Sequence, residues 1–233
     1  MNFDKLISLK KKALAVLIDP DKYRPELVDL CNGERVAFFL VGGSKLRKGN
    51  IRKTVKDIKK RCKIPVVLFP GDEAQLCAEA DGLLVLSLLS GRNPEYLISK
   101  QVKAAPLIRK MALHTLPVAY ILVGENTEST TAKVSKTKPI QNRKEVVHTA
   151  MAAEQLGFKA IYLEAGSGSG KTVSTQFIKS VSQAVSIPVI AGGGVKTSKN
   201  LKSIFEAGAH VAVVGNALES NPKLILQLLK VFE

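Results

Sequence analysis

The sequence predicts a single (β/α)8 barrel of the TIM type, within the α/β class. Short apolar runs rich in leucine and β-branched residues alternate eight times with longer connecting segments over 233 residues. Nearly every position within a run is apolar, which is typical of parallel strands that helices cover. Eight alternations suit a barrel of about 250 residues better than an open, doubly wound sheet. We therefore expect residues 1–233 to form one domain.

The eight apolar runs are the expected strands, at residues 13–18, 36–41, 66–69, 83–86, 118–123, 160–163, 189–191 and 211–214. Apolar residues at helical spacing predict helices in the connections, at residues 51–60, 94–110, 144–156, 175–185, 198–207 and 222–232. The third connection, residues 71–81, is short, and we expect it to be irregular and to lack a proper helix.

One connection differs from the others in composition. Residues 124–143 have the sequence GENTESTTAKVSKTKPIQNR, with six Ser or Thr residues and almost no apolar periodicity. Long loops without structure are usually lids, binding loops or disordered segments. We expect such a loop after the fifth strand, and the sequence leaves open whether it is a mobile lid or a surface excursion.

Composition excludes several classes of protein. With 45% hydrophobic and 24% charged residues the chain is not intrinsically disordered, and no apolar run reaches the roughly 20 residues of a membrane-spanning helix. The three cysteines have no metal-ligand spacing and leave one unpaired, which favours a reducing compartment. The amino terminus has its lysines after the apolar residues, the reverse of a secretory signal. We therefore expect a cytoplasmic protein.

The formal charge of +15 favours anionic ligands, because cationic surfaces attract anions. The lysines are spread over the whole chain, aromatic residues make up only 5%, and no RRM, KH or zinc-finger pattern is present. We therefore do not expect nucleic acid to be the main ligand. Small phosphates and diphosphates remain, beside the simpler alternative of a well-solvated lysine-rich surface.

Glycine clusters follow the last two expected strands, where active sites of such barrels form. They are Gly192-Gly193-Gly194 and Gly215-Asn216. Glycines let backbone N–H groups approach an anion closely, and the next helix adds the positive end of its dipole. Two clusters at these positions predict a phosphate site. The alternative is that the glycines only form tight turns.

Polar side chains follow three other strands. Asp19 ends the first and Ser44 follows the second, so the two could share a Mg²⁺ ion that takes further ligands from substrate phosphates. Asp-Pro is also a common turn, and that alternative stays open. Glu164 ends the sixth strand, in the mouth or buried, and needs a hydrogen-bonding partner such as a substrate hydroxyl.

A rival motif overlaps the sixth connection. Residues 165–172, AGSGSGKT, match a relaxed P-loop pattern with alanine in place of the first glycine, between a strand and a helix. A P-loop enzyme also needs a second strand that ends in an Asp to help hold Mg²⁺, and the runs at 83–86 and 211–214 end in Ser and Gly-Asn instead. Nucleotide hydrolysis is therefore the weaker alternative.

Taken in order, the motifs resemble those of geranylgeranylglyceryl phosphate synthases over almost the whole length. They are Asp19-Pro20-Asp21, Gly42-Gly43-Ser44, Phe69-Pro70-Gly71, Ser90-Gly91-Arg92-Asn93-Pro94, Thr137-Lys138-Pro139-Ile140, residues 162–168, Gly192-Gly193-Gly194 and Gly215-Asn216. The SGRNP and TKPI stretches resemble the longer-chain subgroup. The resemblance implies a Mg²⁺-dependent barrel enzyme that joins the 3-hydroxyl of sn-glycerol 1-phosphate to geranylgeranyl diphosphate or a related prenyl diphosphate, forming an ether-lipid precursor and pyrophosphate.

Residue by residue, the resemblance places Mg²⁺ on Asp19 and Ser44. It places glycerol phosphate on Tyr162, Leu163, Glu164, Ala165, Gly166, Ser167, Gly168, Gly193, Gly194, Gly215 and Asn216. Glu164 and Tyr162 would hold the glycerol hydroxyl in line with the allylic carbon, and whether Glu164 also accepts the proton stays open. We further expect a homo-oligomer with peripheral membrane contact and no transmembrane segment.

Other phosphate-binding proteins remain as alternatives. A barrel isomerase or aldolase of small sugar phosphates would share the glycine clusters, but an aldolase needs a strand-end lysine for a Schiff base and none of the eight runs supplies one. A non-catalytic phosphate-binding protein would share them too, and turnover with product analysis separates it from an enzyme.

The P-loop alternative yields the first prediction. A P-loop lysine contacts the β- and γ-phosphates of a nucleotide, whereas here Lys171 lies beyond the residues matched to glycerol phosphate. We expect no ATP or GTP binding by calorimetry. Lys171→Ala should lower the rate of prenyl transfer at most several-fold, which corresponds to less than about 1 kcal/mol. This loss should become smaller as the salt concentration rises. Micromolar nucleotide affinity that disappears in the variant would contradict the barrel interpretation.

Overall fold

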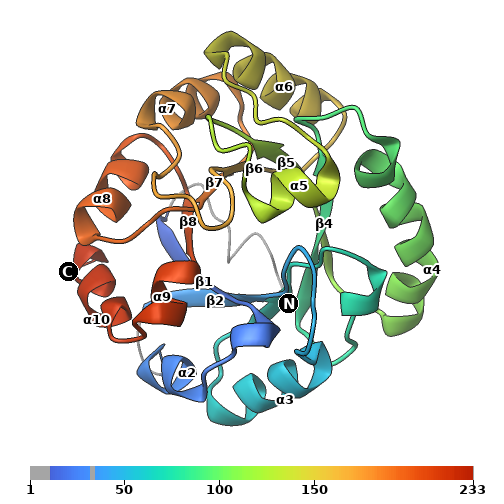
Figure 1. Ribbon diagram of the computed structural model, residues 1–233, viewed down its shortest axis with the longest axis vertical. Coiled ribbons are helices and arrows are strands. Elements are labelled where there is room, and N and C mark those ends of the chain that lie inside the picture. The colour runs from blue at the N-terminus through green and yellow to red at the C-terminus, as the bar shows by residue number, and fades with distance from the viewer. Residues whose placement is uncertain (1–10, 32–34, 233) are drawn as a thin grey trace.

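The computed structural model describes residues 11–31 and 35–232, and its core is a closed barrel of eight parallel strands in chain order (Figure 1). The strands are β1 (Ala13–Ile18), β2 (Val36–Val41), β3 (Val66–Leu68), β4 (Gly82–Leu88), β5 (Thr115–Leu122), β6 (Ala160–Glu164), β7 (Val189–Gly192) and β8 (Val211–Val214). Strand β8 pairs with β1 and closes the barrel. The predicted fold class is confirmed, and every expected strand is present with ends shifted by three residues or fewer.

Helices surround the barrel. They are α2 (Pro25–Cys31), α3 (Ile51–Arg61), α4 (Lys100–Met111), α5 (Thr130–Ser135), α6 (Arg143–Gln155), α7 (Thr175–Ala184), α8 (Ser198–Glu206), α9 (Asn216–Ser220) and α10 (Leu224–Leu229). A π-helical turn, Glu95–Ser99, precedes α4, and a 3-10 turn, Lys230–Phe232, follows α10. The six expected helices are therefore present, although these turns make up part of two of them.

The third connection lacks an α-helix, as the sequence predicts. It contains only the 3-10 turn η2 (Glu73–Gln75), so in the ring of helices α3 is followed by α4 with a short irregular segment between them (Figure 1). An apolar groove forms here beside β4.

The expectation of a structureless loop at residues 124–143 is wrong. The segment contains α5, and Val123 forms a parallel bridge with Ile140. Ser129 caps the helix by accepting a hydrogen bond from the Ala132 amide at 3.2 Å, and the helix buries its own residues Ala132 and Ser135. A six-residue helix has no measurable apolar period, so its stability comes from packing that the sequence pattern does not reveal.

The core has two layers set by the alternation of side chains along the strands. Tyr162 in β6 points into the barrel interior, where it joins inward side chains such as Phe38 and Ile190. Its neighbours Ile161 and Leu163 point outward and pack beneath the helices. Glu164 lies two residues after Tyr162 and so continues the inward row at the carboxyl end of the barrel.

Candidate active site

A polar pocket occupies the carboxyl end of the barrel. Ten predicted site residues line it: Asp19, Ser44, Tyr162, Glu164, Ser167, Gly168, Gly193, Gly194, Gly215 and Asn216. The other three, Leu163, Ala165 and Gly166, do not. Leu163 is buried in the outer apolar layer because it alternates with the inward residues. The assignment of Leu163, Ala165 and Gly166 to substrate binding remains a prediction.

The Glu164 carboxylate is buried at the base of the polar pocket, with 6% of its surface exposed. Its Oε1 atom accepts a hydrogen bond of 2.7 Å from the Gly166 amide, and the hydroxyls of Tyr120 and Tyr162 also donate to the carboxylate. Burial disfavours the charged form and raises the pKa of Glu164 to about 7, although the three hydrogen bonds oppose the shift. The residue is therefore poised to exchange a proton near neutral pH.

Three aromatic rings support this carboxylate. Tyr120 and Tyr162 face each other across the β5–β6 pair with ring centroids 5.0 Å apart, and Phe69 stacks on Tyr162 at 5.4 Å. Gly192 in β7 leaves the space for Tyr162, since a Cβ atom there would lie 2.2 Å from the tyrosine hydroxyl oxygen. Glycine at position 192 thus allows the tyrosine to reach Glu164.

The glycines after β7 bring backbone close to the pocket floor. Gly193 and Gly194 have φ values of +90° and +71°, which side chains other than glycine rarely adopt. A Cβ atom at position 193 would lie 2.6 Å from Glu164 Oε1. After β8, Gly215 precedes α9, whose first turn no side chain caps. These are exposed backbone donors of the kind that hold phosphate.

Asp19 and Ser44 line the same side of the polar pocket. Asp19 Oδ1 accepts the Asp21 amide at 2.9 Å, and partial burial together with the nearby Glu219 and Asp21 raises its pKa. Ser44 Oγ is 3.3 Å from Thr131 Oγ1. A single half-buried carboxylate among like charges, beside a hydroxyl, fits a Mg²⁺ ion that takes most ligands from water and phosphate. Among the described residues no group of three or more His, Cys, Asp or Glu side chains forms a metal cage.

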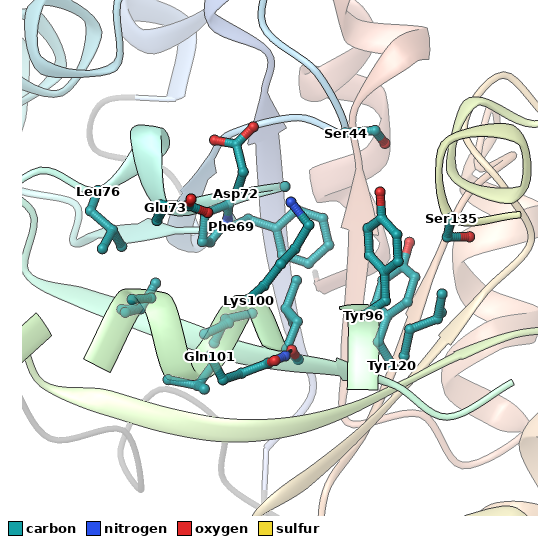
Figure 2. A pocket seen from close by; sticks show the side chains of 18 of the residues that line it. Ser44, Phe69, Asp72, Glu73, Leu76, Tyr96, Lys100, Gln101, Tyr120 and Ser135 are labelled. Carbon is teal, nitrogen blue, oxygen red and sulfur yellow. Dashed lines mark hydrogen bonds between the residues drawn. The ribbon is translucent and has the colours of Figure 1, made fainter. Parts of the chain in front are cut away.

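A second cavity, the apolar groove, adjoins the polar pocket and shares Ser44, Phe69 and Tyr120 with it. It lies between β4, α4 and the third connection, and it is lined by leucines of β4, by Leu76 of the third connection and by Ala104 and Ile108 of α4. Figure 2 shows Lys100 extending from α4 into this groove beside Phe69, with Asp72 and Glu73 on the opposite wall. The groove therefore presents an apolar lining directly beside the polar pocket.

The SGRNP and TKPI stretches meet in space beside the groove. Asn93 Nδ2 donates to the Ser135 carbonyl at 3.1 Å, and a Cβ atom at Gly91 would lie 2.5 Å from Thr137 Oγ1. The Tyr96 hydroxyl donates to the Val134 carbonyl at 3.0 Å and joins the start of α4 to α5. Two motifs more than 40 residues apart thus lie next to the segments that carry Tyr96, Val134 and Ser135 into the groove lining.

Residues 7–232 match the model of the PcrB family. The chain belongs to the PcrB family. Its relatives in this family include proteins named geranylgeranylglyceryl phosphate synthase. That of Flavobacterium johnsoniae is 43% identical over 217 residues, which cover 91% of this chain and 89% of the relative. That of Pyrococcus abyssi is 35% identical over 221 residues, covering 92% of this chain and 87% of the relative.

Solved structures agree with this assignment. The crystal structure of (S)-3-O-geranylgeranylglyceryl phosphate synthase from Thermoplasma acidophilum, in complex with its substrate sn-glycerol-1-phosphate, has a TM-score of 0.89 and 30% identity, covering 98% of this chain and 95% of that one. The N-acetylmannosamine-6-phosphate 2-epimerase of Clostridium perfringens has a TM-score of 0.61 at 16% identity, and shares the fold alone.

This PcrB-family chain also uses residues that no sequence motif revealed. Tyr120 could have been found, because strand alternation places it on the inward row of β5, level with Tyr162. Thr131 lies in the segment that we expected to be structureless. Lys100 lies in the helix expected at residues 94–110, of which only the Leu, Ile and Ala residues were expected to line a prenyl cavity. The sequence carries no signal for Gln75.

Gln75 joins the third connection to the turn after β2. Its side chain is 1% exposed, and it makes two hydrogen bonds with Gly43: Nε2 donates to the carbonyl at 2.8 Å and Oε1 accepts the amide at 3.1 Å. Gly43 precedes Ser44, so this pair of bonds fixes the backbone that presents the serine to the polar pocket.

Gln75→Leu should therefore destabilise the PcrB-family barrel. The leucine fills a similar volume but leaves both backbone groups of Gly43 unpaired, so we expect the free energy of unfolding to fall by about 1–3 kcal/mol. Urea denaturation measures this loss. The exposed Gln176→Leu serves as the matched control and should change stability by less than about 0.5 kcal/mol. Equal losses in the two variants would show that the contact with Gly43 contributes nothing.

Proposed function

We propose that this protein is a Mg²⁺-dependent prenyltransferase of the geranylgeranylglyceryl phosphate synthase type. It joins the 3-hydroxyl of sn-glycerol 1-phosphate to geranylgeranyl diphosphate or a related prenyl diphosphate, which yields an ether-lipid precursor and pyrophosphate. The observation that carries the proposal is that a glycine-lined pocket with a buried carboxylate adjoins an apolar groove, in a PcrB-family chain. A phosphate and a hydrocarbon chain can thus meet at one point.

Glycerol phosphate binds in the polar pocket. Its phosphate lies on the backbone donors of Gly193, Gly194, Gly215 and Asn216, which their φ values and the uncapped start of α9 leave accessible. The glycerol hydroxyl then meets Glu164 and Tyr162 at the base. The structure of the relative from Thermoplasma acidophilum in complex with sn-glycerol-1-phosphate supports this choice of ligand.

The prenyl diphosphate spans the two cavities. Its hydrocarbon occupies the apolar groove and its diphosphate lies near Asp19 and Ser44, which would hold Mg²⁺. When bound, Mg²⁺ neutralises charge on the departing diphosphate. Lys100 in the groove and Lys45 in the polar pocket add positive charge on the two sides of Ser44.

The bond changes take place at the boundary between the cavities. The glycerol oxygen attacks the allylic carbon, the carbon–oxygen bond to diphosphate breaks, and its electron pair leaves with pyrophosphate. Glu164 accepts the hydroxyl proton, a role that suits a carboxylate whose pKa is raised to about 7. Phe69 and Tyr120 line both cavities, so their ring faces lie where positive charge develops on carbon.

The alternatives fit the site less well. Lys171 does not line the polar pocket, and its carbonyl packs against Gly194, where a Cβ atom would lie 2.2 Å away. This packing argues against a nucleotide cradle. The epimerase similarity supports a shared barrel only, and a sugar-phosphate enzyme would have no use for an apolar groove.

We also propose that residues 1–233 act as one domain, that the chain belongs to the longer-chain subgroup and forms a homo-oligomer, and that it works in the cytoplasm with peripheral membrane contact. The close approach of Gly91 in the SGRNP stretch to Thr137 in the TKPI stretch supports the subgroup. Helix α4 supports the oligomer, because it buries none of its residues while Val102 and Leu107 are exposed. Within the described residues, no helix has the length and apolarity needed to cross a bilayer.

Asp19→Asn tests the metal site. The amide keeps the oxygen that accepts the Asp21 N–H group, so the melting temperature should stay near that of the wild type, while loss of the charge should lower turnover by about a hundredfold or more. Magnesium titrations of prenyl transfer check this. Asp29→Asn, at an exposed carboxylate outside the pocket, is the control. Full activity of Asp19→Asn at limiting Mg²⁺ would remove the assignment.

Glu164→Gln tests the proton acceptor. In the wild type kcat/KM for glycerol 1-phosphate should rise through about pH 7, because only the ionised carboxylate accepts a proton. The variant should lose this rise together with most of its activity. A variant that keeps the wild-type kcat/KM and its pH dependence would contradict the role.

The same carboxylate should affect stability without substrate. Its pKa is raised from 4.5 in the unfolded chain to about 7 in the folded one, so ionisation favours unfolding as pH rises between these values. Relative to Glu164→Gln, the wild type should lose about 3 kcal/mol of unfolding free energy from pH 4.5 to 7. Urea denaturation at several pH values measures this difference.

A further inference from the structure

Positive charge is concentrated on helix α3 and the loop before it. Cationic residues occur along the whole chain, yet residues 45–63 hold ten of the 35 Lys and Arg residues and a single Asp, which is +9 of the formal +15. The buried face of α3 is apolar, with Val55 and Ile58 fully buried, so these cations lie on its outer face.

Six of these side chains line one shallow hollow on the surface, which we call the cationic face: Lys48, Arg52, Lys53, Lys56, Lys60 and Arg61. Asp57 is the one carboxylate in this lining, and it accepts hydrogen bonds from the Tyr23 hydroxyl at 2.5 Å and Arg61 Nε at 2.8 Å. The Asp57 carboxylate is therefore already hydrogen-bonded, and the six cations give the hollow a strong net positive charge.

The cations divide into two groups. On one side of α3, Arg52 and Lys56 pair with Glu79, and Lys59 pairs with Asp81. Lys48, Lys53 and Lys60 form no ion pair within residues 11–31 and 35–232, and all three are exposed. These three are available to an external anion.

The cationic face lies on the side of α3 that faces α2, where Pro20, Tyr23 and Pro25 complete the lining of the hollow. The third connection lies on the other side of α3: Glu79 and Asp81 bind cations of α3, and Leu76 of the same segment lines the apolar groove. In the ring of helices, α3 stands between α2 and α4 (Figure 1). Helix α3 and the third connection therefore separate the hollow from the apolar groove.

We propose that the cationic face docks on the surface of an anionic lipid bilayer. The inference rests on the proposed function, because a long prenyl diphosphate partitions into bilayers and the ether product is itself a lipid. Several lysines together hold a protein on an anionic bilayer, and the attraction fades within a Debye length of about 10 Å at 0.1 M salt.

A bilayer suits this surface better than a nucleic acid does. Single-stranded nucleic acids need aromatic rings on which bases stack. Tyr23 is the aromatic residue of the hollow; it is half-buried and its hydroxyl is held by Asp57. A shallow hollow with cations around it instead matches an extended layer of phosphate headgroups.

Vesicle sedimentation with the full chain tests the proposal. The wild type should bind vesicles of phosphatidylcholine with 30% phosphatidylglycerol, should bind pure phosphatidylcholine at least tenfold more weakly, and should be released by 0.5 M KCl. The triple variant Lys48→Glu, Lys53→Glu, Lys60→Glu should lose at least tenfold in affinity for the anionic vesicles.

The matched control is the triple variant Lys144→Glu, Lys159→Glu, Lys179→Glu, on exposed lysines at the α6–α7 side of the barrel (Figure 1). Both variants lower the formal charge from +15 to +9, so only position differs. The control should bind within about twofold of the wild type, and thermal melting verifies that both variants fold.

Two results would overturn the proposal: equal binding of the wild type to both kinds of vesicle, or equal losses in the two variants. Tight binding of a labelled oligonucleotide that anionic vesicles do not displace, and that only the α3 variant loses, would assign the surface to nucleic acid. Turnover with detergent-dispersed prenyl diphosphate should be unchanged in both variants. Failure of that turnover in the wild type would count against the enzyme function itself, whatever the vesicles show.

Discussion

The site depends on one buried carboxylate, that of Glu164. Burying a charge without partners is unfavourable. Hydrogen bonds from the Gly166 amide and from the hydroxyls of Tyr120 and Tyr162 stabilise the buried carboxylate. Each partner imposes a further constraint. Tyr162 requires glycine at position 192, and the carboxylate itself requires glycine at position 193, because a Cβ atom at either place would collide. The glycines of this region therefore serve the acid as much as the phosphate.

A second constraint is the helix missing from the ring. In a barrel of this kind, helices cover the outward face of the strands. The outward apolar side chains of the strands therefore have no contact with ligands. At the third position the short turn η2 leaves that cover incomplete, and leucines of β4 line a groove instead of a sealed core. The same short connection carries Gln75, which holds the turn before Ser44, and Glu79, which binds α3. The third connection, residues 71–81, thus contacts the apolar groove, the turn before Ser44 and the cationic helix α3.

The fold was predictable because its signal is local. Eight apolar runs, each buried on both faces, leave few architectures, and the strands follow them closely. Predictions failed where local pattern is weak. Helix α5 has only six residues, and its position at the pocket depends on the burial of its residue Ala132 and on the Val123–Ile140 bridge. Helices α2 and α9, both short, were likewise not expected from apolar spacing.

For the site, the sequence alone determined which strand ends carry chemistry: Asp19, Ser44, Glu164 and the two glycine clusters all follow predicted strands, and ten of the thirteen predicted residues line one pocket. This works because parallel strands bring their carboxyl ends to one edge. The tertiary structure decided the rest. Tyr120 bonds to Glu164 through the register of β5 on β6, and Gln75 reaches Gly43 across 32 residues of chain. The groove arises because a helix is absent. Such contacts depend on strand register, on closure of the barrel and on packing between distant segments. None of these produces a periodic pattern in the sequence.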